Sequence, residues 1–220
     1  MRLILIRHGQ TPSNVGHYLD TAEPGPGLTE LGREQALALP QTLGGEGIEA
    51  IYASTLIRTQ QTAAPLARVL GQEVRIRRDL REIPAGSLEM TNDEGSIQAY
   101  LSVVLGWAGG APERVMPGTE RDGFSVLRSF DQVVEEIAFT GVGAAAVVSH
   151  GAMIRAWAAS RAENITPDFA AQHPVSNTGA VLVTGEPGRW WAERWQEHAL
   201  GGPAVADEHA DGAAADTVRR

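Results

Sequence analysis

A short apolar run near the start of the chain is followed directly by charged residues, and this limits the folds that the chain can adopt. Residues 3–6 are Leu-Ile-Leu-Ile, and Arg7 and His8 follow directly. A short, continuous run of branched apolar residues is typical of a strand that is buried on both faces of a parallel sheet. Thr11-Pro12 follows, and a Thr before a Pro is a helix-start signal. We therefore expect Arg7 and His8 at the carboxyl end of a strand, where open α/β sheets bind ligands.

Further along the chain, short apolar runs alternate with segments of helical pattern. We predict strands at residues 3–6, 48–53, 74–76, 144–148, 181–183 and 190–195. We predict helices that begin near Thr29, where Pro40 should kink or end the helix, and at residues 56–70, 97–105 and 152–161. This alternation predicts an α/β fold with a mostly parallel sheet.

The domain organisation follows from where the alternation breaks. A chain of 220 residues suits one α/β domain, which we place at residues 1–198. Residues 84–125 fit the alternation poorly, and we interpret them as an excursion over the active site; a plain surface insertion is the alternative. Residues 199–220 are rich in Ala, Gly, Asp and Glu without periodicity, which predicts a weakly ordered tail.

Charge and cysteine content narrow the classes of partner. The net charge of −9 disfavours nucleic acid and anionic membranes as partners, and a small anionic substrate would need a local cluster of Arg and His. Without cysteine the chain has no disulfide, thiolate nucleophile or Cys-based metal site. The first apolar run is too short for a signal peptide, and no stretch approaches the length of a membrane span, so we expect a cytoplasmic protein.

Basic residues follow three of the predicted strands. They are Arg7-His8, Arg58 just after the strand that ends at Ser54, and His150. If these strands are parallel neighbours, their ends meet at one edge of the sheet. Two guanidinium groups suit a phosphate because each is permanently charged and binds oxygens in a bidentate way. Two histidines can add a nucleophile and a further hydrogen-bond donor.

Four segments of the chain together resemble the histidine phosphatase superfamily, in its phosphoglycerate-mutase-like branch. The segments are Arg7-His8-Gly9-Gln10-Thr11 with Asn14, residues 54–63, Leu80-Arg81-Glu82 followed by Gly86, Leu88 and Glu89, and Ser149-His150-Gly151. Arg-His-Gly alone is a weak signal, but four segments in the order of the family are a strong one. The resemblance implies a three-layer α/β/α sandwich and spans roughly residues 3–195.

The resemblance also implies roles for individual residues. His8 would be the nucleophile, and Arg7, Arg58 and His150 would hold the phosphoryl oxygens. Glu82 would protonate the leaving alkoxide and then deprotonate the attacking water. No metal and no cofactor are implied.

Four further residues complete the comparison with the family. Gly9 and Asn14 join the predicted phosphate-binding set, although Asn14 could instead satisfy backbone groups in the first helical turn. Glu89 and Glu120 match the family pattern only approximately, and we leave them out of the predicted site.

The predicted function is a metal-independent phosphomonoesterase that acts on a small phosphorylated metabolite through a phosphohistidine. One alternative is a cofactor-dependent phosphoglycerate mutase, whose usual insertion is rich in Tyr, Asn and Lys; residues 83–118 hold one Tyr, one Asn and no Lys. The alternative from another class is a catalytically silent phospho-ligand or protein-binding module. A homodimer is compatible with the sequence.

Overall fold

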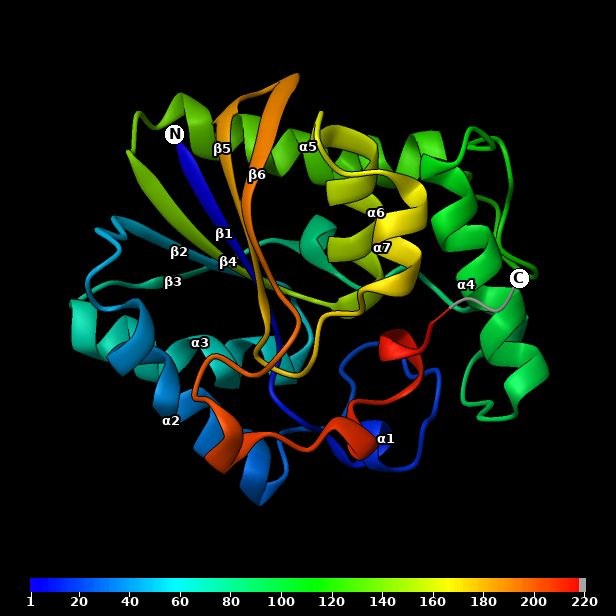
Figure 1. Ribbon diagram of the computed structural model, residues 1–220, viewed down its shortest axis with the longest axis horizontal. Coiled ribbons are helices and arrows are strands. Elements are labelled where there is room, and N and C mark those ends of the chain that lie inside the picture. The colour runs from blue at the N-terminus through cyan, green and yellow to red at the C-terminus, as the bar shows by residue number, and fades with distance from the viewer. Residues whose placement is uncertain (218–220) are drawn as a thin grey trace.

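The computed structural model describes residues 1–217 and contains a six-stranded sheet between two layers of helices (Figure 1). The strands lie in the order β3-β2-β4-β1-β5-β6. The first four pair in parallel, and β5 and β6 are antiparallel to their neighbours. Their bounds are β1 Arg2–Arg7, β2 Ala50–Ala53, β3 Val74–Ile76, β4 Ala144–Ser149, β5 Ala180–Glu186 and β6 Arg189–Gln196. The prediction of an α/β fold with a mostly parallel sheet is confirmed.

Strand β1 shows why this sheet needs helices on both faces. Leu3 and Leu5 point into one hydrophobic core, while Ile4 and Ile6 point into a second core on the opposite face. A strand that is apolar on both faces is stable only where both faces are covered. The helices on the Ile4 face are α2 Glu30–Leu43 and α3 Ile57–Leu70, and those on the Leu3 face are α4 Glu94–Ala108, α5 Gly123–Phe139, α6 Gly151–Arg161 and α7 Pro167–Gln172. This is the three-layer sandwich that the family resemblance implied.

The short helix α1, Pro12–Val15, begins where the sequence predicted. The Thr11 side chain accepts a hydrogen bond from the backbone N–H of Asn14, and the Asn14 side chain accepts one from the backbone N–H of Thr11. This reciprocal cap satisfies two N–H groups at the start of the helix. It also fixes the turn that joins β1 to α1, on which His8 lies.

The structure differs from the predicted elements in two respects. Helix α2 does not end at Pro40 but continues to Leu43. Leu39 and Leu43 are buried in the core, and this packing offsets the backbone hydrogen bond that proline cannot donate. Helices α5 and α7 were not predicted, although Asp122 caps the first turn of α5 and an apolar face of seven buried residues follows.

The segment after β6 packs along the body of the molecule, past α1 and towards α4 (Figure 1). It contains three short turns of 3-10 helix, η3 Pro203–Val205, η4 Glu208–Ala210 and η5 Ala213–Ala215. The weak order predicted for residues 199–220 stays a prediction, and residues 218–220 lie outside the described part of the chain. Within that part, no helix is both long enough and apolar enough to cross a membrane.

Candidate active site

Three of the predicted site segments meet because three neighbouring parallel strands end at the same edge of the sheet. Arg7 at the end of β1 lies beside Ser149 at the end of β4, and Val148 lies beside Ala53 at the end of β2. His8, His150 and Arg58 follow these strand ends directly or within one helical turn. The carboxyl edge of the sheet therefore gathers the basic residues, as the order of strands and helices predicted.

The side chain of His8 is buried and held in one tautomer. Its Nδ1 lies 2.8 Å from the carbonyl oxygen of Gly9, and Arg58 Nε donates to its Nε2 over 3.2 Å. A guanidinium only donates, so Nε2 must carry a lone pair and the ring proton lies on Nδ1. Burial lowers the pKa of His8 well below its usual value, and the charges of Arg58 and Arg7 lower it further. His8 is thus a neutral imidazole whose unprotonated nitrogen can act as a nucleophile.

Arg7 and Arg58 bring two buried guanidinium groups to His8. Arg7 donates to the carbonyl oxygen of Val175 over 2.7 Å and to that of Asp211, which leaves its Nε without a hydrogen-bond partner. Arg58 donates to His8 and, over 2.9 Å, to the carbonyl oxygen of Asp20, which leaves its Nη1 without a partner. Buried donors in native proteins are almost always paired. Unpaired donors on two cations are suited to an anion.

His150 lies directly against His8, with 5.1 Å between the ring centroids in an edge-to-face arrangement. Its Nε2 lies 2.9 Å from Ser54 Oγ, whereas its buried Nδ1 has no hydrogen-bond partner. Burial is the main cause that lowers the pKa of His150 well below its usual value, and the charge of Arg58 adds to it. His150 therefore adds a second neutral imidazole to the cationic cluster.

Glu82 is a buried carboxyl group at the amino terminus of α6. Its Oε1 accepts hydrogen bonds from the N–H groups of Ile83 and Met153, and its Oε2 accepts one from Ala152. Burial raises the pKa of Glu82, while these three N–H groups and the charge of Arg58 lower it by a smaller amount. A raised pKa favours the protonated form, which is the form that a general acid needs.

The two other predicted phosphate-binding residues have structural partners. The side-chain oxygen of Asn14 accepts hydrogen bonds from the N–H and the hydroxyl of Thr11, so it satisfies a backbone group in the first helical turn, the alternative role that the sequence left open. Asn14 also lines the pocket. The N–H of Gly9 donates to Thr62 Oγ1 over 2.9 Å, and a Cβ on Gly9 would lie 2.6 Å from the carbonyl oxygen of Gly32. The geometry thus favours a packing role for Gly9, and a phosphate contact there stays a prediction.

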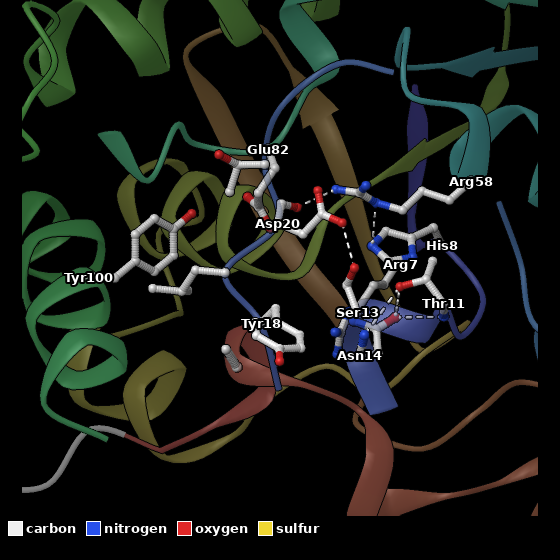
Figure 2. A pocket seen from close by; sticks show the side chains of 13 residues that line it. Arg7, His8, Thr11, Ser13, Asn14, Tyr18, Asp20, Arg58, Glu82 and Tyr100 are labelled. Atoms are coloured by element: carbon white, nitrogen blue, oxygen red, sulfur yellow. Dashed lines mark hydrogen bonds between the residues drawn. The ribbon is translucent and has the colours of Figure 1, made fainter. Parts of the chain in front are cut away.

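The pocket in front of His8 contains residues that sequence reasoning missed. Figure 2 shows Glu82 and Tyr100 across the pocket from His8, with Asp20 between Glu82 and Arg58. The lining residues that were not in the predicted site are Thr11, Ser13, Tyr18, Leu19, Asp20, Thr21, Tyr100 and Ala213. Tyr100 comes from α4, within residues 84–125; that these residues form an excursion over the active site stays a prediction. Most of the others lie on the loop after α1, where the sequence carried no periodic signal.

Glu89, which we left out of the predicted site, holds the loop that carries Asp20. Its carboxylate accepts hydrogen bonds from the N–H groups of Thr21 and Ala22 and from the Thr21 hydroxyl. The carbonyl oxygen of Asp20 in turn accepts from Arg58. Glu89 therefore positions Arg58 through the loop. Its partial match to the family pattern was the signal that could have found it.

Glu120 is exposed and does not line the pocket. Within residues 1–217, no group of three or more His, Asp or Glu side chains gathers in a way that could hold a metal ion.

Comparison with known proteins agrees with this geometry. A family model described as the histidine phosphatase superfamily (branch 1) matches residues 3–198. The PE-PGRS family protein PE_PGRS11 of Mycobacterium tuberculosis is 38% identical over 206 residues, which are 86% of this chain and 35% of that protein. A glucosyl-3-phosphoglycerate phosphatase of M. tuberculosis is 42% identical over 89 residues, which are 39% of this chain and 38% of that enzyme. The chain thus spans less than half the length of these curated relatives.

A solved structure supports the same assignment over most of the chain. The mycobacterial glucosyl-3-phosphoglycerate phosphatase in complex with VO3 superposes with a TM-score of 0.74 at 27% sequence identity, covering 89% of this chain and 98% of that one. The family match, the shared fold and the motifs at the strand ends agree. The chain belongs to the histidine phosphatase superfamily, branch 1.

Proposed function

We propose that the protein is a phosphomonoesterase that transfers the phosphoryl group of a small phosphorylated metabolite to His8 and then hydrolyses it. The observation that carries this proposal is the set of buried, unpaired nitrogen atoms around His8: the donors Arg7 Nε and Arg58 Nη1, and His150 Nδ1, which donates when Ser54 Oγ donates to His150 Nε2. They offer hydrogen bonds to the oxygens of a phosphoryl group in a site from which water is largely excluded. The relatives named as phosphatases support the same reaction class.

In the first step, the lone pair on His8 Nε2 attacks phosphorus as the bond from phosphorus to the leaving oxygen breaks. The leaving alkoxide takes the proton of Glu82. Arg7, Arg58 and His150 hold the phosphoryl oxygens and stabilise the charge that they carry in the transition state.

In the second step, water attacks phosphorus while the Glu82 carboxylate takes its proton. The bond between phosphorus and His8 breaks, which releases inorganic phosphate. His8 returns to its neutral tautomer, and Glu82 is again protonated.

The substrate is proposed as a class. Ser13 of α1 and the loop residues Tyr18, Asp20 and Thr21 surround the leaving-group side of the pocket with polar groups. A hydroxylated or carboxylated leaving group fits such a lining. Glucosyl-3-phosphoglycerate, the substrate for which the mycobacterial relative is named, is therefore the first ester to test. We keep a cytoplasmic location and a homodimer as predictions.

The test is hydrolysis of a panel of phosphomonoesters by the purified protein in EDTA, with the His8→Ala variant as control. We expect turnover that survives EDTA, disappears in the variant and leaves an acid-labile phosphoryl label on His8. Substantial activity in His8→Ala would contradict the nucleophile assignment.

Phosphoglycerate mutase is the alternative, because a probable phosphoglycerate mutase of Photorhabdus laumondii is 36% identical over 92 residues. Addition of 2,3-bisphosphoglycerate separates the two functions. Isomerisation of phosphoglycerate that exceeds hydrolysis would favour the mutase. If the protein binds phosphate but neither hydrolyses any ester nor isomerises phosphoglycerate, the catalytically silent binding module is favoured.

A further inference from the structure

Residues 203–217, here called the C-terminal segment, lie outside the residues that match the family model, yet they border the active site. Side chains from several elements hold the segment by its backbone. Gln35 Nε2 donates to the carbonyl oxygen of Val205 over 2.9 Å, and Arg155 Nη1 donates to that of Asp216 over 3.0 Å. Figure 1 shows the segment in red as it passes α1 and runs towards α4.

Asp211 connects this segment to the catalytic cluster by two hydrogen bonds. Its backbone carbonyl oxygen accepts from Arg7 Nη2, and its carboxylate accepts from the N–H of Asn177 over 2.7 Å. The side-chain amide of Asn177 donates to the carbonyl oxygen of His8 over 3.1 Å and to Asn14 Oδ1 over 3.2 Å. Asp211 is itself buried, with 6% of its surface exposed. It therefore contacts one phosphate-binding residue directly and the nucleophile through one intermediate.

The neighbouring residues show that the segment is shaped for this position. A Cβ on Gly212 would lie 2.8 Å from the Cα of Asn14, and Gly212 has a φ of +82°, which side chains other than glycine rarely adopt. Ala213 follows; the residue is 2% exposed and lines the pocket together with Tyr18 and Tyr100. The close approach at Gly212 thus places the small side chain of Ala213 in the wall of the pocket.

We propose that the C-terminal segment is the specificity-determining wall of the substrate pocket, in which Ala213 limits the size of the leaving group and Asp211 positions Arg7. The proposal rests on the proposed function, since the pocket must hold a phosphoester. Ala213 belongs to the buried hydrophobic core and lines the pocket, so a longer side chain there must extend into the pocket or displace packed neighbours, which is costly. The segment therefore discriminates among esters by the bulk of the leaving group rather than by its charge.

The size limit is tested by binding, in a background that cannot turn over. His8→Ala protein, with and without Ala213→Leu, is titrated with phenyl phosphate and 2-naphthyl phosphate, whose leaving groups are similar in acidity but differ in size. We expect Ala213→Leu to weaken binding of the naphthyl ester by about tenfold more than that of the phenyl ester. Ala204→Leu, at an exposed position of the same segment, is the matched control and should change neither. Equal effects on both esters would overturn the assignment of Ala213.

The positioning role of Asp211 is tested with inorganic phosphate on otherwise wild-type protein. Asp211→Ala removes the acceptor for the buried N–H of Asn177 and should weaken phosphate binding by about tenfold. Asp211→Asn keeps an oxygen at the same place and should restore most of the affinity. If Asp211→Ala lowers the melting temperature but leaves phosphate affinity unchanged, the residue is merely structural and the positioning role fails.

Both tests measure binding, so they give an answer whether or not the protein hydrolyses esters. If the protein turns over no ester, the proposed function fails while the ratio of the two ester affinities still decides the role of the wall. If the protein hydrolyses esters normally but Ala213→Leu leaves the ratio of the two ester affinities unchanged, the specificity role of the C-terminal segment is refuted and the proposed function stands.

Discussion

Replacement of Glu82 by Gln tests the proposed acid with little change in shape. In Glu82→Gln the side-chain oxygen can still accept from the N–H groups of Ile83 and Met153. The new amide nitrogen would face the N–H of Ala152, which then loses its acceptor. One buried, unsatisfied N–H costs about 1–3 kcal/mol of folding free energy, so we expect a destabilised but folded variant.

The kinetic effect follows from the leaving group. An alkoxide is a poor leaving group, and a positioned general acid accelerates its departure by about 10²–10⁴-fold. We expect kcat/KM of Glu82→Gln to fall by that factor for glycerol 2-phosphate. For p-nitrophenyl phosphate, whose leaving group hardly needs a proton, the loss should stay below about tenfold. The ratio kcat/KM is the quantity to compare, because it excludes hydrolysis of the phosphohistidine, in which Glu82 also takes part.

The pH dependence gives a second test in the same variant. Burial raises the pKa of Glu82, so the protonated acid is lost, and kcat/KM for the alkyl ester falls, as the pH rises through that raised pKa. Burial lowers the pKa of His8, so the nucleophile is protonated, and kcat/KM falls, only when the pH drops through that lowered pKa. With the alkyl ester, kcat/KM of the wild-type protein should therefore fall both at high pH, the alkaline limb, and at low pH, the acid limb. Glu82→Gln should lose the alkaline limb and keep the acid limb.

The control for Glu82→Gln is Glu120→Gln, which makes the same chemical change at an exposed position outside the pocket. Glu120→Gln should leave kcat/KM for both esters, and its dependence on pH, unchanged. Equal losses on the alkyl and aryl esters in Glu82→Gln, or an alkaline limb that persists in that variant, would refute the assignment of Glu82 as the acid.

Two further variants test packing and positioning. Gly9→Ala places a Cβ against the backbone of Gly32 and should destabilise the fold by about 1–3 kcal/mol in urea denaturation; Gly45→Ala, which meets nothing within 4 Å, is its control, and equal stability of the two would contradict the packing role. Glu89→Ala releases the loop that holds Arg58 and should lower kcat/KM by about tenfold, with recovery in Glu89→Gln. Identical kinetics in both Glu89 variants would count against positioning through the loop.

The fold class and the location of the basic cluster could both be predicted from the sequence. Residues 3–6 are apolar at every position, and such a strand must be covered on both faces, which specifies helices above and below a parallel sheet. Arg7, His8, Arg58 and His150 were located correctly at one edge because the carboxyl ends of parallel strands meet there. Both inferences depend only on local pattern and on general rules for how such patterns pack.

The groups that complete the site could not be predicted, because they are brought together by contacts between segments that lie far apart in the sequence. The tautomer of His8 depends on Gly9 and Arg58, and Arg58 is oriented by a loop that Glu89 holds from 68 residues away in the sequence. The C-terminal segment carried no periodic signal, yet Asp211 and Ala213 border the pocket. Their positions depend on single hydrogen bonds and on one close backbone approach between distant segments. Such contacts leave no repeating pattern in the sequence, because hydrophobic periodicity records which face of an element is buried but not what it is buried against.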